Sequence, residues 1–226
     1  MQVAPHRANK YVRKYPERIT RALKLNYVFK KVRYAHAFTV TVPAVGSAYE
    51  YIVSANDCHQ PDANPASPHQ PLGWDQYSAF YGEYLVVGSK ATLRSTWSDT
   101  ASGGACYISG GYVGPMDSAA GGFWTSPGNA TENGASTKIL AGYTSAAGVS
   151  HATTYSAKKY YGLQTQNLRS HNDIIALTSE SPTDKHRFAF RFESLDTAAS
   201  AKINCMLEIE YNVCLFSTFR ARAENT

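Results

Sequence analysis

The chain has 226 residues, of which 43% are hydrophobic and 17% are charged, and it carries a net charge of +5. This length allows one large domain, and the low charged fraction favours short strands joined by turns over long solvated helices. No run of 18 apolar residues is present, and the first 30 residues lack the apolar core of a secretory signal, so we expect neither a membrane span nor secretion. The four cysteines form no CxxC pair, which favours reduced thiols in an intracellular compartment.

The positive charge is concentrated at the N-terminus. Residues 1–36 carry ten bases and one acid, whereas residues 37–226 carry 12 bases and 16 acids. A basic arm on an acidic body is typical of nucleic-acid binding, and the alternative is a solvated tail that aids solubility. Apolar residues recur every four positions from Tyr11 to Leu23, which predicts a helix that begins near Pro16. A helix this short orders only when its charge is neutralised or its apolar stripe is covered.

The apolar period changes from four to two within the basic segment. After Lys30 and Lys31 the alternation moves to the other parity, and such a slip predicts a bulge or a strand break. We therefore expect the first strand of the folded body at about residues 33–43. This boundary divides the chain into an arm of residues 1–32 and a body of residues 33–226.

The body is predicted to consist of strands and loops. Runs rich in strand-forming residues, each bounded by turn-forming residues, predict further strands at residues 49–55, 84–97, 104–114, 136–145, 152–163, 185–194 and 201–216. A short helical turn is expected within residues 74–84. Alternate residues of the last strand share one face, and these are Ile203, Cys205, Leu207, Ile209, Tyr211 and Val213. About eight strands without a strong long helix predict an all-β, two-sheet sandwich or barrel.

The common catalytic motifs are absent from the sequence, which has no GxSxG, GxxxxGK[ST], GxGxxG or HExxH pattern. Cys58, His59 and His69 fall in one proline-rich loop but lack the ligand spacing of a structural zinc site. Glu208 and Glu210 share one face of the last strand, which suits either cation binding and acid–base catalysis or a face turned to solvent or another subunit. We favour the second alternative and expect no enzymatic activity, no cofactor and no metal site.

Residues 71–97, PLGWDQYSAFYGEYLVVGSKATLRSTW, resemble the motif region of capsid proteins from circovirus-like viruses with small circular single-stranded DNA genomes. In that family a Pro-x-Gly-x-Asp-Gln stretch leads through a tyrosine-rich turn into a strand with Gly-Ser-Lys, here Gly88, Ser89 and Lys90. The segments HRFAFRFES and INCMLEIEYNVCLFS are similar to the last two long strands of that family. The arm has lysines and tyrosines where circoviruses are typically richer in arginine.

The resemblance implies an eight-stranded antiparallel jelly-roll sandwich with a basic N-terminal arm, in which residues 33–226 form the shell domain. It implies self-assembly of roughly 60 copies into a T=1 icosahedral shell around a single-stranded DNA genome. The protein is then expected in the virion and, during assembly, in the host nucleus, and recombinant protein is expected to package RNA. Loops at residues 57–72 and 98–137 are candidates for contacts between subunits or for outer surface.

The arm has the composition of a nonspecific binder of single strands. Its bases neutralise phosphates, and its aromatic rings stack on unpaired bases at roughly 1–3 kcal/mol each. The predicted nucleic-acid-binding residues are Arg7, Lys10, Tyr11, Arg13, Lys14, Tyr15, Arg18, Arg21, Lys24, Lys30, Lys31 and Arg33. The last three also fit a K-K-x-R nuclear-import signal. Tyr27, Phe29 and Tyr34 either stack on bases or pack against the body.

Two other functions remain open from the sequence. One is a lectin-like β-sandwich binding module with an incidental basic tail, and the other is the jelly-roll coat protein of a small RNA virus. Closed particles of uniform size distinguish a coat protein from a binding module, whereas the physical chemistry of the arm is the same for DNA and RNA.

Overall fold

The computed structural model describes residues 27–42, 47–62, 69–98, 105–115, 122–141, 148–162, 168, 172–195 and 201–218. The strands in this part of the chain are β1 (Tyr27–Val42), β2 (Ala48–Ser54), β3 (Tyr81–Trp97), β4 (Cys106–Pro115), β5 (Ser136–Leu140), β6 (Val149–Ser156), β7 (Ile175–Leu177), β8 (His186–Ser194) and β9 (Ala201–Thr218). The helices are α2 (Trp74–Ser78), α3 (Pro127–Glu132), α4 (Ala157–Tyr161) and the 3-10 helix η1 (Asn172–Ile174). Within these ranges no helix has both the length and the apolar character needed to cross a membrane.

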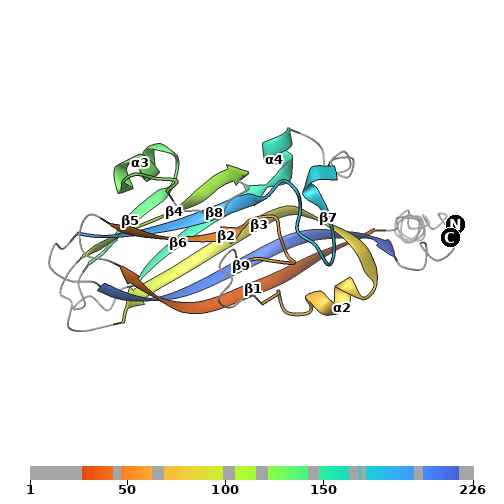
Figure 1. The fold of residues 1–226 in the computed structure, drawn as a ribbon, viewed down its shortest axis with the longest axis horizontal. Coiled ribbons are helices and arrows are strands. Elements are labelled where there is room, and N and C mark those ends of the chain that lie inside the picture. The colour runs from red at the N-terminus through yellow and green to blue at the C-terminus, as the bar shows by residue number, and fades with distance from the viewer. Residues whose placement is uncertain are drawn as a thin grey trace, which may run out of the picture.

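The strands form two antiparallel sheets that pack face to face (Figure 1). The larger sheet has the order β1-β9-β3-β6, with β7 also paired to β3, and the smaller sheet has the order β2-β8-β4-β5. The chain passes repeatedly from one sheet to the other, so neighbours within a sheet are distant in sequence. For example, β1 pairs with β9 from Tyr27↔Phe216 to Val42↔Ala201. This winding is an all-β antiparallel jelly roll, which confirms the two-sheet sandwich expected from the strand pattern and the jelly roll implied by the resemblance.

The first strand begins earlier than expected. β1 starts at Tyr27, and it pairs with β9 without a register shift, so the bulge expected after Lys31 is absent. The change of parity has another cause: Phe29 lies on the outer face and is 53% exposed, whereas Val32 and Tyr34 face the core. Residues 27–32, which were assigned to the arm, therefore belong to the sheet.

Two further differences from the expected strands concern short elements. β7 was not predicted, because three residues are too few to show an alternation. The strand expected at residues 152–163 ends at Ser156, where α4 begins. The Ser156 hydroxyl accepts a hydrogen bond from the Lys159 backbone N–H, which is the usual way in which serine caps a helix.

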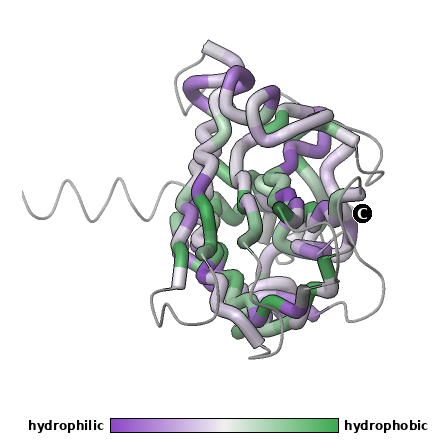
Figure 2. The backbone as a smooth tube through the Cα atoms, turned by 90° about the vertical axis from the view of Figure 1, so that its left-hand side faces the viewer, coloured by the Kyte–Doolittle hydropathy of each residue, from purple (hydrophilic) through white to green (hydrophobic). Residues whose placement is uncertain are grey.

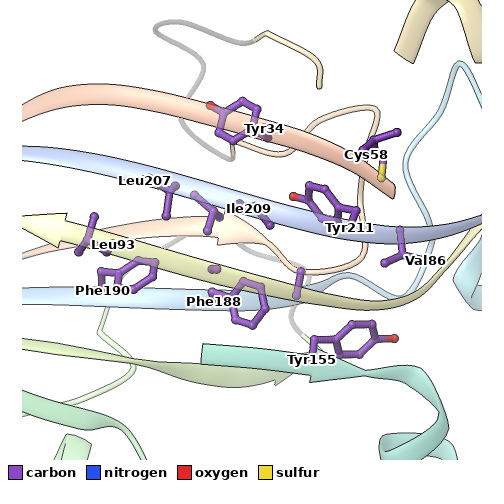
Figure 3. Close-up of a cluster of buried hydrophobic side chains, with 14 of the residues drawn as sticks. Tyr34, Cys58, Val86, Leu93, Tyr155, Phe188, Phe190, Leu207, Ile209 and Tyr211 are labelled. Carbon is purple, nitrogen blue, oxygen red and sulfur yellow. The ribbon is translucent and has the colours of Figure 1, made fainter. Parts of the chain in front are cut away.

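Alternation places one face of each long strand in the core between the sheets. In β9 the alternate residues from Ile203 to Val213 are buried, as predicted. Figure 3 shows part of this cluster, with Phe188 and Phe190 of β8 beside residues of β9. Burial of one such side chain contributes roughly 1.5–3 kcal/mol. Viewed along the long axis, apolar and hydrophilic segments alternate along the strands that enclose the interior (Figure 2).

All four cysteines are free and buried. Cys205 and Cys214 lie on opposite faces of β9, as their odd spacing predicts. Burial raises the pKa of the Cys106 thiol to about 12 and that of Cys205 to about 11. These thiols therefore stay protonated near neutral pH and pack as small apolar side chains.

Candidate nucleic-acid and assembly surfaces

The predicted nucleic-acid-binding residues fall into two groups. Those before Tyr27 lie outside the described residues, and they are Arg7, Lys10, Tyr11, Arg13, Lys14, Tyr15, Arg18, Arg21 and Lys24. Lys30, Lys31 and Arg33 lie on β1, and all three are exposed. Because residues alternate along a strand, Lys31 and Arg33 share the outer face of the larger sheet while Lys30 points to the other side. The K-K-x-R pattern is thus split between two faces, and its role in nuclear import stays a prediction.

The two bases on the outer face are paired with one carboxylate of β9. Lys31 Nζ lies 2.8 Å from Glu210 Oε1, and Arg33 Nη2 lies 3.2 Å from Glu210 Oε2. The hydrogen bond from Lys31, with a further one from Arg33, lowers the pKa of Glu210. The Lys31 and Arg33 side chains are still 66% and 81% exposed. Exposed pairs of this kind contribute about 0–1 kcal/mol, so both bases can exchange this partner for a phosphate.

Glu208 and Glu210 both form ion pairs with bases on the outer face of the larger sheet. Glu208 lies on the same outer face, with Oε1 2.8 Å from Arg94 Nη1. Each carboxylate therefore has a basic partner on a neighbouring strand. The lowered pKa of Glu210 is also the opposite of what a general acid requires. The arrangement favours a ladder of surface charges over an acid–base pair.

The three aromatic residues at the start of the body have different environments. Tyr34 is 1% exposed and its ring stacks on His69 at a centroid distance of 4.4 Å. Tyr27 is half-buried and meets Phe29 edge to face at 5.5 Å. Phe29 presents its ring to solvent on the face that carries Lys31. The packing alternative therefore holds for Tyr34, whereas for Phe29, which is 53% exposed, stacking on bases stays a prediction.

The residues considered as metal ligands do not converge. Cys58 is completely buried in the core. His59 Nδ1 lies 2.8 Å from Gln70 Nε2, and His69 is stacked on Tyr34. Across the part of the chain that the structure describes, no group of three His, Cys, Asp or Glu side chains is placed to hold a metal ion.

The described parts of the loop at residues 57–72 are anchored to the core by two buried carboxylates. The Tyr51 hydroxyl donates to Asp62 Oδ2 at 2.6 Å, and the Tyr84 hydroxyl donates to Asp57 Oδ1 at 3.0 Å. Sequence reasoning missed these bonds, because nothing in the pattern shows which tyrosine meets which carboxylate. The buried Asp57, Cys58 and Asp62 of this loop are therefore internal structure, and the exposed Leu72 lies directly before α2.

Two large apolar side chains flank α2. Leu72 is 92% exposed and Phe80 is 69% exposed, although Trp74 between them is buried and donates from Nε1 to the Thr178 carbonyl oxygen at 3.2 Å. α2 lies at the end of the sandwich where β1 begins (Figure 1). Neighbouring exposed apolar side chains are typical of surfaces that become buried in an assembly. Both belong to the block that resembles the capsid family, and together they form a candidate assembly surface.

The outer face of the smaller sheet is partly covered. Trp124 and α3 pack with Ile52 and Ala189 of that sheet in a second apolar cluster. Arg191 Nη1 lies 3.2 Å from Glu50 Oε1, and Arg191 Nη2 donates to the Thr125 carbonyl oxygen at 3.2 Å. The region expected as a surface loop at residues 98–137 therefore contains a helix and a buried tryptophan besides the strand predicted at residues 104–114, which is β4, and the parts outside the described residues.

Replacement Arg191→Ala is expected to lower the free energy of unfolding by about 3–5 kcal/mol, because it leaves the buried Glu50 carboxylate without its cation. The matched control is Arg94→Ala, which breaks the exposed pair with Glu208 and should cost less than about 1 kcal/mol. Urea denaturation followed by circular dichroism measures both values. Equal losses in the two variants would contradict the anchoring role of Arg191.

The sequence matches no protein-family model and no curated protein. Among solved structures, the chain is similar to the decameric BFDV capsid protein, with 11% identity, a TM-score of 0.44, and coverage of 84% of this chain and 99% of that one. It is also similar to cocksfoot mottle virus, with 9% identity, a TM-score of 0.46 and coverage of 85% and 96%. A third similar structure is that of Desmodium yellow mottle tymovirus, with 15% identity, a TM-score of 0.39, and coverage of 84% of this chain and 89% of that one. All three TM-scores are low, so the fold is assigned from the strand order of the two sheets and not from these similarities.

Proposed function

We propose that this chain is a viral capsid protein that assembles with copies of itself into a small icosahedral shell and packages single-stranded DNA through its basic N-terminal arm. It acts as a structural protein without enzymatic activity, in the virion and, during assembly, in the host nucleus. The proposed shell is T=1, with roughly 60 copies. The residues that bind the genome are those of the arm, continued by Lys30, Lys31 and Arg33 on β1.

The observation that carries this proposal is the junction between the charged arm and the jelly roll. The basic segment leads directly into β1, the edge strand of the larger sheet, and the last bases of that segment are exposed on it. A polycation fixed to a rigid sheet can hold a polyphosphate against the body without reading its sequence. The resemblance of residues 71–97 to the capsid family supports the same conclusion, and that block forms α2 and β3.

Purification of the full-length recombinant chain tests the proposal. Negative-stain microscopy should show closed particles of uniform size, and nuclease treatment should leave protected nucleic acid inside them. A particle reconstruction then gives the copy number. A dispersed monomer or a small ring would contradict the proposal and favour a β-sandwich binding module. Sequencing the nucleic acid from particles formed in infected cells decides between a DNA and an RNA genome.

The double replacement Leu72→Ser and Phe80→Ser is expected to reduce particle formation at least about tenfold with little change in thermal stability. Both side chains are mostly exposed in the single chain, so the fold gains little from them, whereas an interface would bury them. Ile139→Ser, at a 51% exposed apolar position on β5, is the matched control outside the motif block. Light scattering of assembled material and a melting curve give the two readouts. Normal particle yield in the double variant would remove α2 from the assembly surface.

A further inference from the structure

We propose that the outer face of the larger sheet is a second contact surface for single-stranded nucleic acid, built into the folded body and separate from the arm. The inference rests on the proposed function and adds a site to it. We define this surface, the cationic face, by six outward-facing side chains: Phe29, Lys31, Arg33, Lys90, Arg94 and Lys202.

The strand register brings these bases onto one plane. Arg33 of β1 and Lys90 of β3 are both aligned with Glu210 of β9, which lies between them. The Cα atoms of Arg33 and Lys90 are therefore about 10 Å apart, since neighbouring strands are separated by about 4.8 Å. Between the row of Lys31 and Asn212 and the row of Thr41 and Lys202, the outward positions of β1, β9, β3 and β6 carry five bases and two acids. The face thus has an excess of positive charge on a body that is otherwise mildly acidic.

Two of the bases have no acidic partner of their own. Lys90 and Lys202 are exposed, and neither forms an ion pair with any residue that the structure describes. Two acids share the remaining three bases: Glu210 pairs with Lys31 and Arg33, and Glu208 pairs with Arg94. The pairs are exposed, so a phosphate can replace either carboxylate at little cost.

The rest of the face suits close approach by a polynucleotide. Apart from Met206, which is 38% exposed, the positions between the bases carry short side chains, such as Ala35, Ala37, Thr39, Thr92, Thr96 and Asn204. Short side chains leave the sheet flat, and hydroxyl and amide groups can donate hydrogen bonds to phosphate oxygens.

The exposed ring of Phe29 points to a single strand as the ligand. It lies two residues before Lys31 on the same face of β1 and is 53% exposed. A base can stack on an aromatic ring only when it is unpaired, and an aromatic ring beside cations is the usual combination in nonspecific single-strand binding.

The opposite side of the jelly roll is less suited to this purpose. α3 and Trp124 cover part of the outer face of the smaller sheet, and its Arg191 is paired with Glu50 and Glu193. Of the two outer sheet faces in the described residues, the face of the larger sheet is the one with an excess of exposed bases. It also carries the strand that continues from the arm, so a nucleic acid held by the arm reaches this face first.

The test uses the full-length chain, kept as unassembled subunits under conditions checked by light scattering, and a fluorescent 30-nucleotide oligo(dT). The triple variant Lys90→Gln, Arg94→Gln, Lys202→Gln should make the log–log salt slope of binding less negative by about 2, since each single-strand phosphate contact contributes about 0.7. At 0.1 M salt this corresponds to a loss of affinity of up to roughly 100-fold. Phe29→Ala should weaken binding at least about fivefold without changing the slope.

The matched control is Lys158→Gln, Lys159→Gln, Lys185→Gln, which removes the same charge from α4 and from the segment before β8. We expect a much smaller loss of affinity in the control. A second variant separates loss of binding from misfolding. The double replacement Glu208→Gln with Glu210→Gln removes the partners of Lys31, Arg33 and Arg94 and should raise the affinity for oligo(dT) about tenfold. A misfolded protein would lose affinity, so a gain cannot result from damage to the fold.

The outcomes separate this inference from the proposed function. Wild-type protein that does not bind oligo(dT) would contradict both. Wild-type binding with equal losses in the triple variant and its control, and no gain in the double Glu variant, would overturn the cationic face and leave the arm as the packaging element. A triple variant that assembles poorly but binds oligo(dT) like the wild type would show that the face contacts another copy of the chain.

Discussion

Removal of residues 1–26 is expected to give a protein that folds and assembles but has lost most of its packaged nucleic acid. The deleted segment carries seven bases and one acid, and each lost phosphate contact changes the log–log salt slope by about 0.7. The cut ends directly before Tyr27, so the whole pairing of β1 with β9 is kept. A deletion through Lys30 would also remove the partners of residues 213–216 and would test the fold as much as the binding.

The absorbance ratio at 260 and 280 nm of purified particles, with the amount of nuclease-protected nucleic acid, measures this effect. A full-length variant with the seven bases replaced by Gln should behave like the truncation. A variant with each arginine of the arm replaced by Lys should package normally, because phosphate contacts do not require a particular base. Truncated particles with a wild-type content of nucleic acid would show that the arm is not the packaging element.

The long alternations of the sequence predicted most of the fold. In β9 every second residue from Ile203 to Val213 is buried, because a strand with one face on the core must repeat with a period of two. The same rule applies at the junction with the arm, where Val32 and Tyr34 are buried and Phe29 is not. The slip in parity at Lys30 was correctly located. It marks an apolar residue on the outer face, however, and a bulge was the wrong interpretation.

The contacts that depend on distant partners were beyond sequence reasoning. The covering of the smaller sheet requires Arg191 to meet Glu50, which lies 141 residues away in the chain. A single sequence gives no signal for that pair, so the region around Trp124 was expected to be an exposed loop. The cationic face was missed for the same reason. Lys90 becomes a neighbour of Arg33, and Lys202 comes to share their face, only through the order β1-β9-β3, which the sequence pattern does not specify.

Two buried histidines lead to a second large expected effect, on the stability of the folded chain in mild acid. His151 is 1% exposed on the inner side of β6, and neither ring nitrogen has a hydrogen-bond partner among the described residues. Burial, with a contribution from Lys138, lowers the pKa of His151 to about 4. His186 is completely buried, and burial also lowers its pKa, although the nearby Asp184 opposes the shift.

The hydrogen bonds of His186 explain why its neutral form suits the fold. The Tyr112 hydroxyl lies 2.5 Å from Nδ1 and the Tyr161 hydroxyl lies 2.9 Å from Nε2. A neutral imidazole can accept from one hydroxyl and donate to the other, whereas a protonated ring has no acceptor. These bonds join β4 and β8 of the smaller sheet to α4, the helix that follows β6 of the larger sheet.

The direction of the pH effect follows from the depressed pKa values. An unfolded histidine has a pKa near 6.5, so between pH 6.5 and 4 the unfolded chain binds more protons than the folded one. The free energy of unfolding is therefore expected to fall as the pH drops through this window. For His151 the loss from pH 7 to pH 5 is about 2 kcal/mol, and His186 adds a loss in the same direction.

Urea denaturation of the unassembled chain at pH 7, 6 and 5 measures this dependence. The variant His151→Leu should reduce the loss between pH 7 and pH 5 by about 2 kcal/mol, because the leucine cannot be protonated. Leu72→Ser, at an exposed position that carries no titratable group, is the control and should keep the wild-type dependence. An unchanged pH dependence in His151→Leu would show that this histidine is not held neutral by the fold.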